Sequence, residues 1–541
     1  MRMRTFEAAV LATFLLGVVL RLPTFGRPML SDDEAIYATT ADAMARGDLL
    51  YRDVVDHKPP LIYHVYQAGF AALGPYNTHG AHALVILAVL LTAGFLFAIK
   101  RREASGGGEG PALAAAGLFL IFSTTWHDYD ALSANCELFV LVPQAAAAWL
   151  VLRDLRRTPL PNPLPASRGE GIGGIGGIGA HLAVGVLIGT SALFKYQGLT
   201  FLGASIGMLI WWAILGRASW SWVAARAVCQ VAGAVLPPAL YLAWCAAAGN
   251  ATAAIYWFKF NFSYVGAGLT GFAAIARGLR RTLLIGGVAL VPYGLGIAAA
   301  VAAASGVVRV LRRRRDADAP PPSVVLGLLW LVTSAIAVAS GGRFFGHYFL
   351  LILAPLCLLA APTFCRLWST GWSRRAPLVA LCALPALLFF VLATVGRPIA
   401  AKLDEREPGY GQVAARIAEL TSDDERMFVW GNSPQLYVLA RRPMGARFSF
   451  SNYMTGESPG TPTETGQRNA DVNQLPAAWE MLFADLERRR PALFVDAAAA
   501  GWDGYGKYPL ARYPRLRAYV DQHYRPVAVS AGVVIYRRLS M

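Results

Sequence analysis

The chain has 541 residues, of which 56% are hydrophobic and only 15% are charged. This composition is too apolar for a soluble globular protein and indicates a multi-pass membrane protein. The formal net charge of +16 is carried mostly by segments that join apolar runs on one side of the membrane. No basic stripe therefore remains that would bind nucleic acid.

The first apolar run, residues 6–22, predicts a transmembrane helix. It ends in Leu22-Pro23-Thr24-Phe25-Gly26, which offers no small-residue cleavage site, so we expect an uncleaved helix rather than a signal peptide. Ten further runs of membrane-spanning length lie near 81–99, 111–126, 135–152, 181–194, 198–215, 227–248, 282–306, 323–341, 345–365 and 376–395. The sequence thus predicts an α-helical multi-pass membrane protein with about eleven transmembrane helices.

Basic residues predict the orientation in the membrane, because positively charged loops stay in the cytoplasm. They fall on alternate loops of one side, at Arg2 and Arg4, 100–102, 153–157, Arg217, 309–315 and 366–375. We therefore expect a bacterial inner-membrane protein with a cytoplasmic N-terminus, a transmembrane domain at 1–396 and a periplasmic domain at 397–541. Within the first domain, the segment 153–180 is rich in Pro and Gly and predicts a flexible cytoplasmic loop.

The first outer loop, about 23–80, carries structure of its own. Ser31 and Glu34 form a capping box, and apolar residues recur at helical spacing up to Gly47, which suits a helix end. This pattern predicts a short amphipathic helix on the membrane surface. We expect an extended segment at Tyr51–Lys58, after which Pro59-Pro60 open a second helix, Leu61–Leu73.

The tail predicts a small α/β domain. Its expected elements are a helix at about 408–420, strands at Met427–Trp430 and Leu493–Asp496, and an alternating segment at Val527–Arg537. All six cysteines lie in or beside apolar runs outside this tail, so we expect no disulfide framework.

Outward-facing charges of the membrane domain separate by loop. Apart from Glu7, the acids lie in the first two outer loops, at Asp32, Asp33, Glu34, Asp42, Asp48, Asp53, Asp56, Asp128, Asp130 and Glu137. The later outer loops hold only bases, at Lys195, Lys259, Arg277, Arg280, Arg281 and Arg343. One acidic and one basic wall would suit a hydroxyl acceptor and a phosphorylated substrate. The alternative is that these acids and bases simply pair across loops.

Four charged residues of the outer loops carry the expected chemistry. Asp33 is the candidate base, because it lies just outside the first span, where a carboxylate is poorly solvated. Glu34 is either a helix cap or a second catalytic acid. Lys58 is held in place by the prolines that follow it, which favours phosphate binding over snorkelling. Lys195 has no acid near it in the sequence, so a phosphate is its expected partner.

Several short motifs, in this order after a first transmembrane helix, together resemble a known family. They are Asp33-Glu34-x-x-Tyr37, Met44-x-x-Gly47 and Tyr51-x-Asp53-x-x-Asp56-x-Lys58-Pro59-Pro60-Leu61-x-Tyr63. This set is similar to the first outer loop of polyprenyl-phosphate-sugar-dependent glycosyltransferases of the C-type membrane superfamily. That group, family 39 and relatives, includes protein O-mannosyltransferases and lipid A aminoarabinose transferases.

The resemblance implies a sugar donor on a lipid phosphate, a lipid, glycan or protein acceptor, and inversion at the anomeric carbon. Asp33 matches the family's acidic base and Glu34 its neighbour, while Lys58 and Lys195 match lysines near the phosphate. The segment Arg343-x-x-x-His347-Tyr348 resembles one near the donor, although Tyr348 could instead belong to the aromatic belt at the interface.

The resemblance leaves two points open. Glu137 resembles the second-loop acid, but the family more often has Asp there, and Asp128 is a rival. A divalent cation could be held by Asp33, Glu34, His57 and Glu137, although their spacing does not decide metal use.

Two other functions are compatible with the pattern. One is a transporter or flippase of lipid-linked sugars, which would show paired repeats and charges near the bilayer midplane. The other is a polysaccharide polymerase or ligase that uses a diphosphate-linked donor. The candidate charges lie at the outer edge of the predicted spans, which favours the glycosyltransferase.

Overall fold

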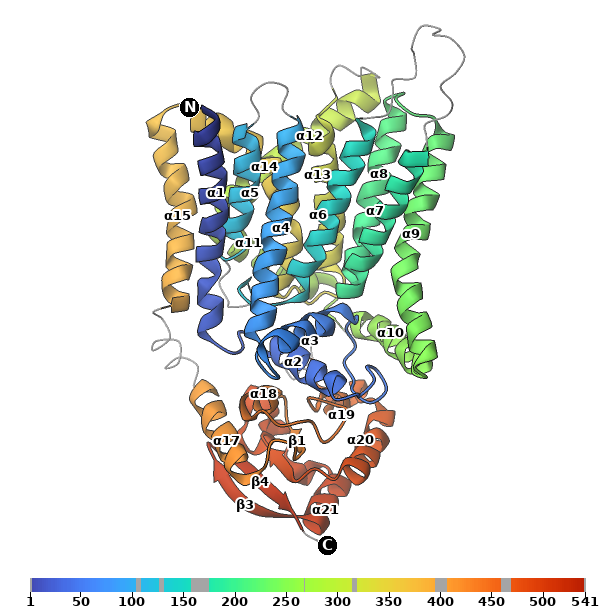
Figure 1. The fold of residues 1–541 in the computed structure, drawn as a ribbon, viewed down its shortest axis with the longest axis vertical. Helices are drawn as coiled ribbons and strands as arrows, with labels where there is room; N and C mark the ends of the chain where they lie inside the picture. Colours follow the sequence, from blue (N-terminus) through green and yellow to red (C-terminus); the bar gives the residue numbers. More distant parts are fainter. Residues whose placement is uncertain are drawn as a thin grey trace.

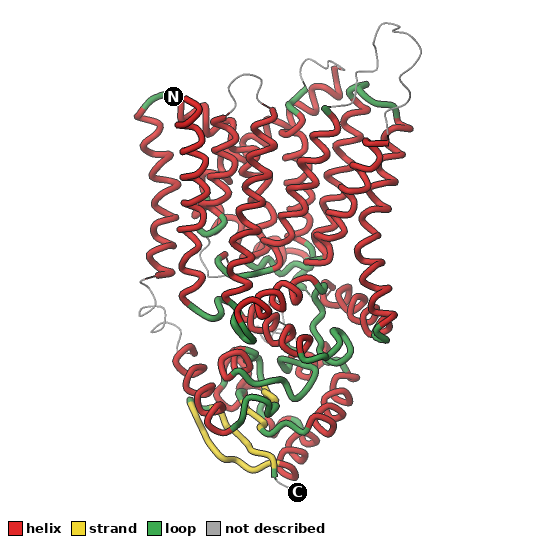
Figure 2. The backbone as a smooth tube through the Cα atoms, viewed as in Figure 1, coloured by secondary structure: helices red, strands yellow, loops and turns green. Residues whose placement is uncertain are grey.

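The structure is a computed structural model that describes residues 2–103, 109–125, 131–156, 175–266, 268–313, 319–394, 406–458 and 469–539. A bundle of long helices forms one end of the molecule, and a small α/β domain forms the other (Figures 1 and 2). The N-terminus lies at the far end of the bundle from the α/β domain (Figure 1). The predicted fold class, a multi-pass helical protein with a C-terminal α/β domain, is confirmed.

Ten helical segments in the described residues are long and apolar enough to cross a membrane. They contain α1 (Arg2–Arg21), α4 (His79–Glu103), α6 (Cys136–Leu155), α7 (Ile175–Phe194), α8 (Phe201–Ile214), α9 (Trp220–Ala247), α12 (Leu290–Arg313), α13 (Pro322–Ala339), α14 (Leu350–Ser369) and α15 (Trp372–Thr394). The 3₁₀ turns η1 (Leu22–Gly26), η3 (Tyr196–Thr200) and η5 (Gly346–Phe349) extend three of them. A shorter apolar helix, α5 (Glu109–Phe122), accounts for the remaining predicted span.

One predicted span is wrong in its extent. The apolar run 282–306 is not one helix, because α11 (Gly271–Val288) ends within it and α12 begins at Leu290. Ala289 between them has φ −101° and ψ 44°, outside the helical region. Hydropathy reports apolarity and not chain direction, so it cannot detect such a break. Another helix, α10 (Ala251–Gly266), precedes α11 and was not predicted.

The predicted flexible loop 153–180 is shorter than expected. Residues 153–155 complete α6, and α7 already begins at Ile175. The Pro-rich part, 157–174, lies outside the described residues.

The first outer loop contains the two expected helices, α2 (Asp32–Ala45) and α3 (Leu61–Leu73). Ser31 caps α2 by accepting a hydrogen bond from the Glu34 N–H at 3.4 Å. The expected open polar face of an amphipathic surface helix is absent from α2, because its residues 34–43 are all buried within the protein. It lies between the bundle and the α/β domain, packed against α3 and α18 (Gln435–Ala440) (Figure 1).

The α/β domain is built on a four-stranded sheet in the order β1-β2-β4-β3. The strands are β1 (Met427–Trp430), β2 (Leu493–Asp496), β3 (Tyr524–Ser530) and β4 (Val533–Arg538). β1 and β2 are parallel and fully buried, as their apolar sequences predict. The alternating segment 527–537 is a hairpin, whose two turn residues, Ala531 and Gly532, have φ of 47° and 81°.

Helices and short turns complete this domain. They are α17 (Arg406–Leu420), α19 (Asn452–Thr455), α20 (Pro476–Arg489), α21 (Pro514–His523) and the 3₁₀ turns η6 (Ala470–Asn473), η7 (Ala498–Ala500), η8 (Trp502–Lys507) and η9 (Leu510–Arg512). The helix predicted at 408–420 is thus confirmed as α17.

Helices α7 and α9 approach closely through glycines. A Cβ atom on Gly185 would overlap the carbonyl oxygen of Gln230, and one on Gly233 would overlap that of Leu182. Small residues at such a contact let two membrane helices pack at short range. This packing matters for the site below, because Lys195 directly follows α7.

We expect Gly185→Ala to destabilise the protein by about 1–3 kcal/mol, since the added methyl group must push α7 away from α9. The matched control is Gly179→Ala on the same helix, where a Cβ would meet nothing within 4 Å. Thermal aggregation of the detergent-solubilised variants measures the difference. Equal midpoints for the two variants would show that the close contact is not needed.

Candidate active site

Asp33 and Lys58 form an ion pair at the end of the helix bundle. Asp33 is the second residue of α2, and Lys58 precedes the two prolines before α3. The Lys58 Nζ lies 2.9 Å from Asp33 Oδ1, and the two side chains are 17% and 27% exposed. Tyr37, one turn further along α2, donates its hydroxyl to Asp33 Oδ2 at 3.3 Å. Both residues expected at this site are therefore brought together and remain partly open to solvent.

A buried carboxylate, Asp56, supports Lys58 from the other side. Its Oδ2 lies 3.9 Å from the Lys58 Nζ and accepts a hydrogen bond from the Tyr63 hydroxyl at 2.8 Å. The Tyr51 hydroxyl donates to the carbonyl oxygen of Lys58 at 2.9 Å. The segment 51–58 is not simply extended as predicted, because Tyr51 has φ 73° and the chain turns back on itself there.

Glu137 and Lys195 form a second ion pair. Glu137 is the second residue of α6 and is 1% exposed, and Lys195 lies in the link between α7 and η3. The Lys195 Nζ stands 3.8 Å above the centre of the Tyr348 ring, and His347 Nε2 lies 3.9 Å from Glu137 Oε1. The structure thus gives Lys195 an acidic partner that its local sequence does not show. Its partner is 58 positions away in the sequence and is brought close by the packing of α6 against α7.

The two pairs form one cluster, which we call the two-pair cluster: Asp33, Lys58, Glu137 and Lys195. Cys136, beside Glu137, donates its thiol to the Tyr37 hydroxyl at 3.4 Å and so links the two halves. Glu137 and Lys195 come from different loops and pair with each other, as the alternative interpretation of the sequence foresaw, whereas Asp33 and Lys58 pair within the first outer loop. Of the four side chains, Glu137 is buried and the other three are partly exposed.

Electrostatics keep Asp33 and Lys58 charged. Burial raises the pKa of Asp33, but the positive charges of Lys58, His347 and Lys195 outweigh it and lower the pKa below its ordinary value. Burial lowers the pKa of Lys58, and the carboxylates of Asp33 and Asp56 more than reverse this, so its pKa lies well above the ordinary value. A carboxylate and an ammonium ion therefore face each other at neutral pH.

Glu34 occupies a different place from Asp33. Its side chain is fully buried, and its oxygens accept hydrogen bonds from the backbone N–H groups of Leu30 and Ala134, each at 2.6 Å. His82 Nε2 lies 3.0 Å from Glu34 Oε1. These contacts hold the start of α2 against α4 and the segment before α6.

The other predicted residues are placed as follows. Arg343 is buried and donates to the Ser458 hydroxyl at 3.1 Å, and Tyr348 lies under Lys195. His57 Nδ1 is 3.1 Å from Asp56 Oδ1 and 3.4 Å from the Tyr453 hydroxyl. Asp128 lies outside the described residues.

The candidate metal ligands do not converge. Among the described residues there is no group of three or more His, Cys, Asp or Glu side chains arranged to hold a metal ion. Asp33 and Glu137 each have a lysine partner, and Glu34 pairs with His82. In this arrangement the four candidates do not fit a divalent cation.

Three residues that support the site were not assigned a role from the sequence: Tyr37, Asp56 and His82. Tyr37 lies four positions after Asp33 in a helix, a spacing that places both on one face and could have revealed the contact. Asp56, two positions before Lys58, would face the same side of an extended strand. His82 offers no such signal, because it is 48 positions from Glu34.

Comparisons with known proteins give the fold a context. The sequence matches no protein-family model and no curated protein. The structure is similar to that of ArnT from Cupriavidus metallidurans bound to undecaprenyl phosphate, with a TM-score of 0.59, 15% sequence identity and coverage of 99% of this chain and 98% of that one.

Two structures of the oligosaccharyltransferase AglB from Archaeoglobus fulgidus are also similar. One is a complex with an inhibitory peptide and a dolichol-phosphate, with a TM-score of 0.56, 13% identity and coverage of 100% of this chain and 75% of that chain. The other is a complex with Zn and sulfate, with a TM-score of 0.56, 14% identity and coverage of 98% and 73%. The chain therefore shares the fold of these membrane proteins.

We expect Lys195→Met to destabilise the protein by about 3–5 kcal/mol, because it leaves the buried Glu137 carboxylate without its partner. The double variant Lys195→Met/Glu137→Leu should recover most of this loss, since no isolated charge remains. Thermal unfolding in detergent measures both. The control is Glu419→Ala, which breaks an exposed pair with Arg416 and should cost less than about 1 kcal/mol. Failure of the double variant to recover stability would contradict the pairing.

Proposed function

We propose that the protein is a membrane glycosyltransferase that moves a sugar from a polyprenyl-phosphate donor to a hydroxyl group of a lipid, glycan or protein, with inversion. The two-pair cluster is the observation that carries this proposal. It places a carboxylate that can accept a proton next to two ammonium groups that can hold a phosphate. The shared fold with ArnT bound to undecaprenyl phosphate and AglB bound to dolichol-phosphate supports it.

The proposed reaction is a single displacement. The carboxylate of Asp33 takes the proton from the acceptor hydroxyl, whose oxygen attacks the anomeric carbon from the side opposite the phosphate. The bond between that carbon and the phosphate oxygen breaks, and its electron pair stays on the phosphate. Lys58 and Lys195 stabilise the charge on the departing lipid phosphate. No step requires a metal ion.

The Asp33–Lys58 pair explains how a weak base could become a stronger one. In the free protein, Lys58 lowers the pKa of Asp33 and so makes it a poor proton acceptor. A bound donor phosphate would attract Lys58 and weaken its hold on Asp33. The pKa of Asp33 would then rise toward the range that suits a base, and it would do so only when the donor is present.

The remaining candidates have supporting roles in this proposal. Glu137 positions Lys195 and orients the acceptor, and Tyr348 packs beneath the Lys195 ammonium near the donor. Arg343 lies at the start of the segment that contains Tyr348 and extends the positive side of the donor site. Glu34 holds the loop that presents Asp33 rather than reacting itself.

The tail is proposed to cover the site from the periplasm of a bacterial inner membrane, with the N-terminus in the cytoplasm. Contacts with the first outer loop support this arrangement. Arg489 pairs with Asp48 at 2.9 Å and donates to the carbonyl oxygen of Asp53 at 2.7 Å. The Val55 N–H donates to the carbonyl oxygen of Arg447 at 2.9 Å. Residues 397–541 would thereby fix the loop that carries Asp33 and Lys58.

We expect Asp33→Asn to lower sugar transfer by about 10²–10⁴-fold, the usual contribution of a positioned general base. The assay incubates the purified protein and acceptor membranes with labelled undecaprenyl-monophosphate and undecaprenyl-diphosphate sugars. Only the monophosphate donor should be cleaved. A diphosphate preference would indicate a polymerase or ligase, and two intact donors would indicate a transporter.

The matched control is Asp32→Asn, one residue earlier in α2. Asp32 accepts a hydrogen bond from the Gln435 side chain, which an Asn oxygen can also accept. The control should therefore keep normal transfer. A wild-type rate for Asp33→Asn would refute the base assignment.

The pH profile tests the Asp33–Lys58 pair separately. The ordinary pKa of an aspartate side chain is 3.8, and the pKa of Asp33 lies below this value. Its carboxylate is therefore still ionised at pH 3.8, and kcat/KM should be lost only at lower pH. Lys58→Met removes the main cation while burial still raises the pKa of Asp33. The acidic limb of the pH profile of the Lys58→Met variant should therefore move to higher pH. An unchanged limb would show that Lys58 does not control Asp33.

A further inference from the structure

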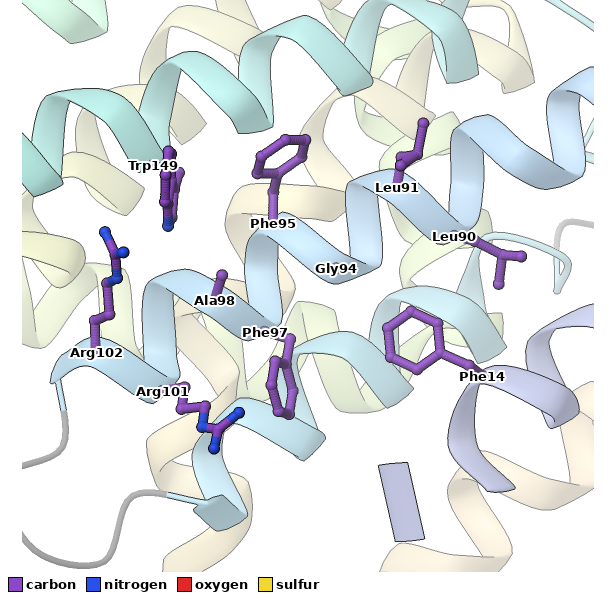
Figure 3. Close-up of a pocket in the computed structure, with 10 residues that line it drawn as sticks. All are labelled: Phe14, Leu90, Leu91, Gly94, Phe95, Phe97, Ala98, Arg101, Arg102 and Trp149. Atoms are coloured by element: carbon purple, nitrogen blue, oxygen red, sulfur yellow. The ribbon is translucent and has the colours of Figure 1, made fainter. Parts of the chain in front are cut away.

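A groove opens on the side of the bundle, at the end opposite to the two-pair cluster. It runs along α4 near Glu103, while the other end of α4, at His79, lies beside α2 and α3 (Figure 1). Its volume is about 570 Å³, and its lining is almost entirely apolar (Figure 3). This size falls in the range of about 300–1,000 Å³ that is typical of ligand pockets.

Small residues on one face of α4 create the groove. Gly94 and Ala98 are four positions apart, so they form its floor, and a Cβ on Gly94 would meet no atom within 4 Å. Phe14 of α1 lies on one side (Figure 3). On the other side, the rings of Phe95 and Trp149 of α6 have their centroids 6.2 Å apart. Aromatic side chains from three helices therefore line this open groove.

Arginines lie at the end of this groove that the positively charged loops predict to be cytoplasmic. Arg101 and Arg102 are exposed in the last turn of α4, and Arg102 and Arg153 stack on the Trp149 ring at 4.5 and 5.3 Å. In the described part of the chain none of the three has an ion-pair partner. An apolar groove with two arginines at its end, and a third on the Trp149 ring beside it, is complementary to an apolar chain with an anionic head.

The dimensions match one leaflet of a membrane. The groove extends along α4 from Leu90 to Arg102, a rise of about 18 Å at the pitch of an α-helix. Half of the hydrocarbon core of a bilayer is about 15 Å thick. The arginines would thus lie at the level of the headgroups when the apolar part lies beside the acyl chains.

We propose that this groove is a binding site for one anionic phospholipid of the cytoplasmic leaflet. One acyl chain lies over Gly94 and Ala98, and the headgroup phosphate is held by Arg101 and Arg102. The bound lipid fills the space between α1, α4 and α6. This site does not depend on the proposed reaction, because it shares no residue with the two-pair cluster.

The experiment measures phosphatidylglycerol retained by the full-length protein in native mass spectrometry, after exchange from nanodiscs that also contain phosphatidylcholine. The wild type should retain phosphatidylglycerol preferentially. Arg101→Ala/Arg102→Ala should retain it about 30-fold less, since each basic residue near the surface contributes about fivefold. The control Arg309→Ala/Arg312→Ala removes two exposed arginines from α12, away from the groove. An equal loss in the control would overturn the proposal, because it would indicate general attraction to negative charge.

A second pair of variants tests the apolar part. Gly94→Leu fills the floor of the groove and should abolish preferential retention, while Gly294→Leu, on an exposed face of α12 with nothing within 4 Å of its Cβ, should not change it. Normal retention by Gly94→Leu would overturn the site. Displacement of phosphatidylglycerol by undecaprenyl phosphate at lower concentration would also overturn it, since the groove would then hold the polyprenyl carrier.

Discussion

A charge buried at the end of a membrane bundle needs an opposite charge or several hydrogen bonds, because water cannot reach it. The site depends on this constraint. Asp33 is held by Lys58, Glu137 by Lys195, and Glu34 by two backbone N–H groups and His82. Each contact joins a different part of the chain. Satisfying the charges therefore also fixes how α2, α4, α6 and α7 meet.

The same contacts make the first outer loop an interior element. Because α2 is covered by the bundle on one side and by α18 on the other, its acids are presented in an enclosed space rather than on an open surface. The α/β domain adds Arg489 on Asp48 and a backbone contact at Val55. This enclosure reduces screening by bulk water, so the attraction between Asp33 and Lys58 is stronger than it would be on an open surface.

Charge and apolar shape also act together at the opposite end of the bundle. There, Arg101 and Arg102 line the end of an apolar groove, and Arg153 contacts Trp149 beside it. At the two-pair cluster the protein supplies both signs of charge itself. At the groove it supplies only the positive sign, and a membrane lipid offers the complementary one.

The sequence by itself determined the features that depend on neighbouring residues. The length and hydrophobicity of the apolar runs predicted the spans, and Pro59-Pro60 marked the start of α3. The apolar residues at 427–430 and 493–496 predicted the two buried strands. Motif order also indicated Asp33 and Lys58, which the fold brings to 2.9 Å. Only the tertiary structure decided that Lys195 meets Glu137, that α2 is buried, and that α11 and α12 are separate helices. These features depend on which helices become neighbours, and residues 58 positions apart carry no local pattern that reveals their contact.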